Sequence, residues 1–389
     1  MHSSTLPRLY TPSFILMAFA NLFTVSSFSS FFLLPLFITN HGGSKADIGI
    51  IMGAFALSSV LCRPWISQMV DSIGRKRSYT IGCLAMSLLP LIYLFFQGNL
   101  SRFYLPLILI RFLHGVGLAI CFTSAFTFIS DIVPAKRLNE GVGMFGVTGL
   151  TGLAIGPVIA EIIVQTFGFS VFFLTASGLA TLGLLLHLRL PESYIHVPHE
   201  ASQSFFSVLI QRRVFTVALL ALLFGFGLAA SSSFVAPFVK EHNIELISLY
   251  FIFYSSAAVI TRFLGGRLAD RVGEEQIIPY ALILTGTGLL ILTSLGGSLV
   301  LVLSGMISGF GHGFLFPCLN SLAVRNATIN IRGKIIGVFT GGIDAGVFIG
   351  SITLGYIGEW AGFRAIFLVA GLVLLAGLAI YRSRIMQDN

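Results

Sequence analysis

Twelve apolar stretches, joined by short polar connections, divide almost the whole of this 389-residue chain. Each is long enough to cross the hydrocarbon core of a bilayer, which takes about 20 helical residues. We expect the crossings at residues 13–39, 46–70, 78–97, 103–132, 140–165, 168–189, 213–239, 246–269, 276–295, 298–325, 332–359 and 362–382. Lipid offers the backbone no hydrogen-bond partner, and nothing indicates the alternating strands of a barrel. The sequence therefore predicts an all-α integral membrane protein.

The composition excludes several classes of protein. Hydrophobic residues make up 56% of the chain and charged residues only 10%, whereas soluble domains are about a quarter charged. This composition therefore excludes a water-soluble globule and a disordered chain. It also excludes a nucleic-acid binder, despite the net charge of +8. The four cysteines lie in apolar runs without a C-x-x-C pair, which favours buried packing residues. We expect no metal site and no organic cofactor.

The basic residues set the orientation. Eighteen of the 23 Lys and Arg fall on one side of the predicted spans, and one, Arg111, falls inside the membrane. The remaining four, on the opposite side, are Lys45, Arg102, Lys240 and Arg364. Because cytoplasmic loops are rich in Lys and Arg, we expect both termini in the cytoplasm and place the chain in a bacterial inner membrane.

The longest polar stretch, residues 191–211, separates the first six spans from the last six. We expect two six-helix units, residues 1–190 and 212–389, with a cytoplasmic linker at 191–211. The units repeat each other. At a spacing of 199 positions, the second unit repeats Arg63, Asp71 and Gly74 as Arg262, Asp270 and Gly273. At a spacing of 194 positions, it again has glycines in the places of Gly115, Gly117, Gly143 and Gly156. Parallel six-helix repeats indicate a pseudo-two-fold axis along the membrane normal and a transporter whose site lies between the units.

Two segments carry a family resemblance. Asp71–Arg77 resembles the loop signature G-x-L-A-D-R-x-G-R-K of the major facilitator superfamily, although Ser67, Met69 and Ser72 depart from it. Its second copy, Gly266–Gly273, matches better and is followed by two glutamates in place of the basic pair. The resemblance implies a transporter rather than an enzyme, with twelve helices in two bundles.

The fifth span narrows the resemblance. It carries Gly143, Gly152, Gly156 and Pro157, similar to the antiporter motif of the bacterial drug:proton (multidrug and sugar efflux) branch, although its last glycine pair is replaced by Ala-Glu. Glycines let helices approach closely, and the proline removes one backbone hydrogen bond. The fourth span, from Arg111, is similar to the superfamily pattern R-x-x-x-G-x-G-x-A.

Few ionisable residues lie within the spans, and a charge there faces a cavity or a partner because lipid solvates it poorly. We predict that Asp344 is the principal proton carrier, with His312, Glu161 and His114 as further candidates. Arg111 is too basic to carry a proton. It would hold a carboxylate or an anionic group, or act as a structural tether. Structural roles also remain open for the other four residues.

The resemblance further implies that spans one, four, seven and ten line a central path. The candidate cavity residues on them are Asn21, Thr24, Phe28, Phe31, Arg111, His114, Phe224, Phe226, Ser231, Phe234, His312, Phe316 and Asn320. Many drug exporters carry an acid on the first span, where this chain has Asn21.

The repeat also predicts a conformational gate. In the family, the basic residue of the loop signature pairs with an acid at the end of the fourth helix. Here that pair would be Arg75 with Asp131, and its repeat would be Glu274 with Arg325, with the signs reversed. Asp71, Gly74, Asp270 and Gly273 would lie beside these pairs. Two solvated loop charges are the alternative, since exposed ion pairs contribute only about 0–1 kcal/mol.

Together these features predict a monomeric secondary transporter that exports a small lipophilic or amphipathic compound by alternating access, with a proton as coupling ion. Transport of a polar metabolite such as a sugar or a siderophore, lysolipid flipping, and a membrane sensor without transport remain alternatives. No Gly-Lys-Ser/Thr phosphate loop is present, so ATP is not the expected driver.

Overall fold

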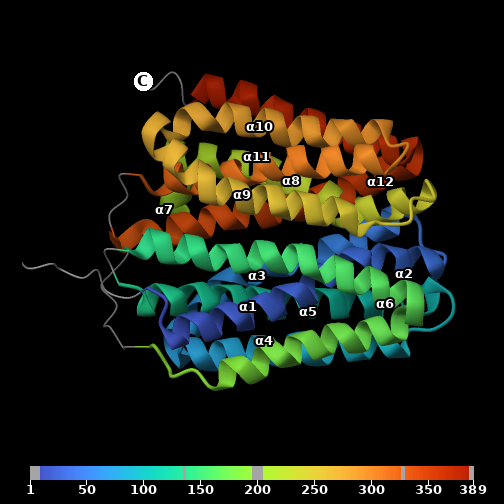
Figure 1. Cartoon of the computed structure of the whole chain (residues 1–389), viewed down its shortest axis with the longest axis horizontal. Coiled ribbons are helices and arrows are strands. Elements are labelled where there is room, and N and C mark those ends of the chain that lie inside the picture. The colour runs from blue at the N-terminus through green and yellow to red at the C-terminus, as the bar shows by residue number, and fades with distance from the viewer. Residues whose placement is uncertain (1–8, 135–136, 195–204, 326–328, 385–389) are drawn as a thin grey trace, which may run out of the picture.

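The computed structural model describes residues 9–134, 137–194, 205–325 and 329–384, and all regular structure within them is helical (Figure 1). The first half contains α1 (Pro12–Ser30), α2 (Leu34–Asn40), α3 (Lys45–Ile73), α4 (Arg75–Ile92), α5 (Tyr104–Ile132) and α6 (Leu138–Leu188). The short α7 (Phe205–Leu209) follows. The second half contains α8 (Arg212–Glu241), α9 (Ser248–Val272), α10 (Glu274–Ile291), α11 (Ser298–Val324) and α12 (Ile329–Arg384). Short 3₁₀ turns join α1 to α2 and extend α4 and α10.

Within the described residues, nine helical segments are long and apolar enough to cross a membrane. Two of them, Glu140–Leu188 and Gly333–Ser383, have 49 and 51 residues, far more than one crossing needs. Each is broken at a glycine with positive φ, Gly168 at 78° and Gly362 at 80°, a conformation that glycine adopts without steric cost. The breaks fall where the sequence predicts a span to end. The prediction of an all-α chain with membrane-spanning helices is confirmed.

Local chemistry sets the helix ends at the signature loops. Ser44 and Asp47 form a reciprocal capping box that starts α3. Gly74, with φ of 98°, ends α3 and starts α4, and Gly273, with φ of 90°, stands at the same point between α9 and α10. Both signature glycines therefore allow a tight reversal that a residue with a side chain would make only under strain.

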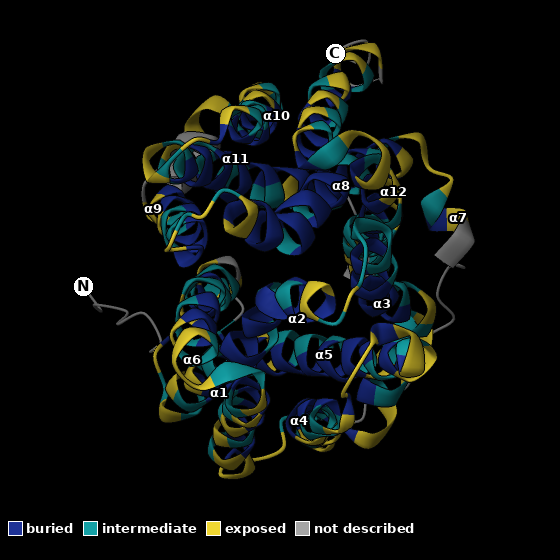
Figure 2. Ribbon diagram, turned by 90° about the vertical axis from the view of Figure 1, so that its right-hand side faces the viewer, coloured by how far each residue is buried: buried dark blue, intermediate teal, exposed yellow. Residues whose placement is uncertain are grey.

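The helices run side by side, with α1–α6 below and α8–α12 above in Figure 1. Contacts between the two groups are made chiefly by α3 with α12 and by α6 with α9. In the end-on view of Figure 2, buried residues lie where helices face one another and exposed residues lie on the outer surfaces. Tight helix contact is thus concentrated inside each group and along these two seams.

Repeat-related glycines make matching contacts. A Cβ on Gly115 would lie 2.2 Å from the carbonyl oxygen of Phe55, and one on Gly309 would lie 2.1 Å from that of Tyr254. Phe55 and Tyr254 are themselves 199 positions apart. The repeat seen in the sequence is thus repeated in the packing of α5 on α3 and of α11 on α9.

The glycines of the antiporter-like motif serve helix packing. A Cβ on Gly156 would lie 2.0 Å from the hydroxyl of Ser29, and one on Gly152 would lie 2.9 Å from the Cβ of Val25, so both positions hold α6 against α1. Gly143 has no neighbour within 4 Å of such a Cβ. Pro157 lies inside α6. Gly350, the repeat of Gly156, meets α8 in the same way.

Candidate functional site

The central feature of the seam between the halves is an ion pair between Arg63 on α3 and Asp344 on α12. Arg63 also donates from Nη1 to the hydroxyl of Thr340, at 2.8 Å. Both charged side chains remain 27% exposed, so the pair is not closed off inside the seam. Asp344, the predicted proton carrier, therefore contacts the opposite half directly. Sequence reasoning missed this pairing because the partners are 281 residues apart.

A second cluster, fully buried, surrounds Arg111 on α5. Arg111 is 1% exposed, lies over the rings of Phe55 at 4.5 Å and Phe31 at 5.5 Å, and donates to the sulfur of Met52 at 3.6 Å. His114 is 0% exposed and edge-on to Phe31 at 4.6 Å. Neither nitrogen of His114 has a hydrogen-bond partner among the described residues, nor do Nε and Nη1 of Arg111.

The Arg111 cluster agrees with the sequence in part. Phe31, Arg111 and His114 are brought together as candidate cavity residues, but no described carboxylate pairs with Arg111. Phe28 lies beside the cluster, stacked on Phe55 at 5.2 Å. Phe55, on α3, was not among the predicted residues, since a phenylalanine in an apolar run carries no distinguishing signal.

A third cluster forms around His312 on α11. Its Nδ1 is hydrogen-bonded to the hydroxyl of Tyr254, Phe224 meets its ring edge-on at 5.0 Å, and Phe316 stacks on it at 6.2 Å. Asn320, one turn beyond Phe316, has a buried Oδ1 with no described partner. Residues from α8, α9 and α11 thus meet here, and three of the predicted residues, Phe224, His312 and Phe316, are in contact.

Other predicted cavity residues serve packing within a half. Thr24 shares a hydrogen bond of 3.0 Å with the hydroxyl of Tyr79, and Ser231 shares one of 2.9 Å with Tyr250. Asn21 donates to Thr148 at 2.8 Å, joining α1 to α6. Phe226 and Phe234 are buried in the apolar core.

Glu161, a further candidate for the proton carrier, lies at the seam between α6 and α9. It is 2% exposed and accepts hydrogen bonds from the backbone N–H groups of Ile247 at 2.6 Å and Ser248 at 2.8 Å. A carboxylate on α6 therefore caps the start of α9 in the other half, where the helix dipole favours negative charge. A similar contact runs the other way across the molecule: Glu359 on α12 accepts from the backbone N–H of Lys45 at the start of α3, at 3.0 Å. The two glutamates are 198 positions apart, so they are not repeat-related positions.

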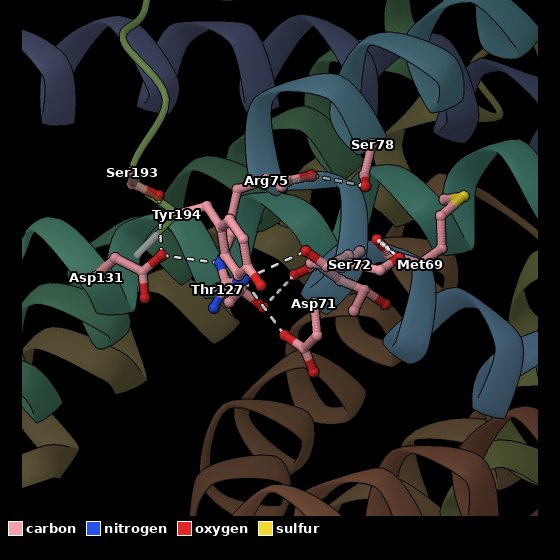
Figure 3. Close-up of polar contacts among 12 residues, drawn as sticks. Met69, Asp71, Ser72, Arg75, Ser78, Thr127, Asp131, Ser193 and Tyr194 are labelled. Atoms are coloured by element: carbon pink, nitrogen blue, oxygen red, sulfur yellow. Dashed lines mark hydrogen bonds and ion pairs between the residues drawn. The ribbon is translucent and has the colours of Figure 1, made fainter. Parts of the chain in front are cut away.

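The predicted gate of the first half is present as an ion pair. Figure 3 shows Arg75 between Asp131, at 2.9 Å, and Asp71, at 3.3 Å. The ring of Tyr194 lies 4.9 Å from the guanidinium, and the hydroxyl of Ser193 donates to Asp131 at 2.8 Å. The start of the predicted linker is thus attached to this gate. Residues 195–204 of the linker lie outside the described residues.

In the second half the predicted pair of Arg325 with Glu274 is also present, but Arg325 contacts a second glutamate as well. Arg325 lies 3.8 Å from Glu274 and makes a closer contact of 2.8 Å with Glu275. The hydroxyl of Ser321 donates to Glu274 at 3.2 Å. The side chain of Asp270 lies outside the described residues. The signs are therefore reversed relative to Arg75 and Asp131, as predicted, while the gating role stays a prediction.

The family now follows from comparison with known sequences. The profile of the Major Facilitator Superfamily matches residues 14–327 and 217–386. The chain belongs to this superfamily. The superfamily and the curated relatives below are transporters, so the chain is a membrane-spanning transporter.

Two curated relatives cover most of the chain. An uncharacterized MFS-type transporter of Methanocaldococcus jannaschii is 23% identical over 359 residues, covering 88% of this chain and 91% of the relative. The multidrug resistance protein MdtG of Salmonella typhimurium is 25% identical over 371 residues, covering 92% and 90%.

Solved structures share the fold. The human organic anion transporter MFSD10 superposes with a TM-score of 0.72, and a mutant of the nucleoside transporter NupG with 0.76, each covering 96% of this chain and 100% of theirs. Both are 15% identical to this chain. At this identity the likeness concerns the fold alone.

Proposed function

We propose that this superfamily transporter is a proton-coupled exporter of a small lipophilic or amphipathic compound. The observation that carries the proposal is the contact of Asp344 with Arg63. A protonated Asp344 is neutral, so proton binding breaks an ion pair that holds α3 to α12. Proton binding and the relative movement of the halves are then linked, as alternating access requires.

The similarity to MdtG supports the export of drug-like compounds, since that relative is named for multidrug resistance. The apolar surroundings of the Arg111 and His312 clusters favour a lipophilic body over a sugar. In this proposal the chain forms twelve crossings, in bundles at residues 1–190 and 212–389 joined by the linker at 191–211. It works as a monomer in the inner membrane of a bacterium, with both termini in the cytoplasm and without metal or organic cofactor.

Transport in proteoliposomes tests the proposal. The purified chain is reconstituted, a pH gradient or a sodium gradient is imposed, and uptake is followed for a panel of lipophilic cations, neutral compounds and anions. We expect accumulation of at least one compound under the pH gradient and none under sodium alone. Accumulation that follows sodium, or that ignores both gradients, would contradict proton coupling.

A further inference from the structure

Arg262 on α9 is the repeat counterpart of Arg63, and the two reach across the seam at matched positions. Arg63 donates to Thr340 on α12. A Cβ on Gly146 of α6 would lie 3.2 Å from Nη1 of Arg262. Positions 146 and 340 are 194 apart, the spacing of the second repeat. Each half therefore sends one arginine into the other half at the same place in the fold.

The two arginines that reach into the other half differ in whether they have a counter-ion. Asp344 pairs with Arg63. The position related to Asp344 in the first half is Leu150, a buried apolar residue. Among the described residues, Arg262 forms no ion pair and no hydrogen bond, and its Nε is buried without a partner. A cation held in a low-dielectric region without a counter-ion is costly unless something else supplies the negative charge.

Accessibility separates Arg262 from the other arginines of the interior. Arg111 is 1% exposed and closed in by aromatic rings. Arg63 is occupied by Asp344. Arg262 is only partly buried. It is the one interior arginine of the described chain that is only partly buried and has no described ion-pair partner.

The surroundings of Arg262 suit an amphipathic ligand. The guanidinium lies 5.3 Å from the centre of the ring of Phe316. That ring belongs to the His312 cluster and also lies 5.3 Å from the ring of Phe339. Gly146 leaves the opposite side free of a side chain. Asn320, one turn from Phe316, adds a buried oxygen without a described partner, which is free to accept a hydrogen bond from a polar group of the ligand.

We propose that Arg262 binds the negatively charged group of the transported compound, so that the substrate class is an organic anion whose apolar body rests on Phe316. The substrate then supplies in the second half the negative charge that Asp344 supplies in the first. A guanidinium suits this task because its planar donors engage a carboxylate or a phosphate through two parallel hydrogen bonds. This inference rests on the proposed export function and names its substrate class.

Equilibrium binding to the purified full chain tests the inference without any gradient, so its outcome is separate from that of the transport assay. Two matched pairs of probes are used: 1-naphthaleneacetate with 1-naphthaleneacetamide, and oleoyl lysophosphatidate with monooleoylglycerol. The first pair represents soluble carboxylates and the second represents lipid phosphates. We expect at least one anion to bind about tenfold more tightly than its neutral partner, the size of a charge-assisted hydrogen bond.

The variants assign that preference to a residue. Arg262→Gln should abolish the preference for the anion, while Arg271→Gln, an exposed arginine on the same helix, should keep it. Leu150→Asp should also abolish it, because it places a carboxylate where the repeat puts Asp344, and Leu150→Asn is its uncharged control. Thermal melting confirms that each variant is folded. Anion preference that is absent from the unmodified chain, or that survives in folded Arg262→Gln, would overturn the inference.

Discussion

At the scale of single residues, the interior charges are not equivalent, because each has a different partner. Asp344 has Arg63, Glu161 has two backbone N–H groups, and Arg111 has aromatic rings. The sequence identified all three acids and bases as exceptional, since charges in apolar spans are rare. It did not identify the partners, because each lies on another element or belongs to the backbone.

Asp344→Asn should abolish transport driven by a pH gradient while leaving substrate binding measurable. The amide is permanently neutral, so it neither takes up a proton nor forms the ion pair with Arg63. Uptake in proteoliposomes and equilibrium binding are measured in parallel. Glu359→Gln, at another seam between the halves, is the control for a general effect of removing an acid there. If the Asn variant still concentrates substrate against its gradient, Asp344 is structural and His312 or Glu161 takes its place as candidate.

Arg111→Lys should lose most transport activity, although the charge is kept. The planar guanidinium lies over two rings at once, and a lysine ammonium does not reproduce that geometry. Initial uptake rates and melting temperatures of Arg111→Lys and Arg111→Met separate function from folding. Normal transport by a stable Arg111→Met variant would show that Arg111 neither acts as a structural tether nor binds the substrate.

At the scale of helices, the sequence was a reliable guide, because apolar length and glycine position are local signals. Every predicted span overlaps a helix, and Gly168 and Gly362 divide the two longest helices where the hydropathy predicts a boundary. Contacts between helices were less predictable. Gly143 and Gly156 belong to the same motif, yet of these two only Gly156 touches α1.

Gly156→Ala should therefore destabilise the chain and Gly143→Ala should not. The added methyl at 156 would overlap the backbone of Ser26 and the hydroxyl of Ser29, whereas the methyl at 143 meets open space. Overpacking of this kind costs about 1–3 kcal/mol. Thermal melting in detergent measures the difference. Equal melting temperatures for the two variants would show that α6 can move away from α1 without loss.

At the scale of the whole molecule, the halves are joined near the starts of α3 and α9 by carboxylates that cap helices. Glu161 accepts two hydrogen bonds from backbone N–H groups of the other half, one on each carboxylate oxygen, but a glutamine offers only one acceptor oxygen there. Glu161→Gln should therefore loosen this end and increase the reactivity of a cysteine placed nearby toward a membrane-impermeant reagent added outside. Gln165→Ala removes the bonds of Gln165 to Glu161 at 3.3 Å and, across the same seam, to the carbonyl oxygen of Glu245 at 3.1 Å, so it measures what the other hydrogen bonds of this seam contribute. Unchanged labelling in Glu161→Gln would show that the cap does not hold the halves together.

The gates at the opposite ends of the helices should respond to charge reversal. Glu274→Arg alone should shift the chain toward inward-facing forms, and adding Arg325→Glu should restore the balance in part. Restoration is expected to be incomplete because Arg325 also contacts Glu275, at 2.8 Å. Cysteine accessibility from each side reports the shift. A double variant that behaves as the sum of its single changes would show that Glu274 and Arg325 are not coupled.

The two kinds of contact between the halves should constrain sequence change among relatives in different ways. Arg63 and Asp344 recognise each other through side chains, so a change at one position creates a pressure for change at the other. Across the seam, Glu161 bonds to the backbone N–H groups of positions 247 and 248, which every residue except proline provides. Among relatives, positions 63 and 344 should therefore covary. Position 161 should stay acidic without covarying with 247 or 248, where packing in the core restricts the side chains and the cap excludes only proline.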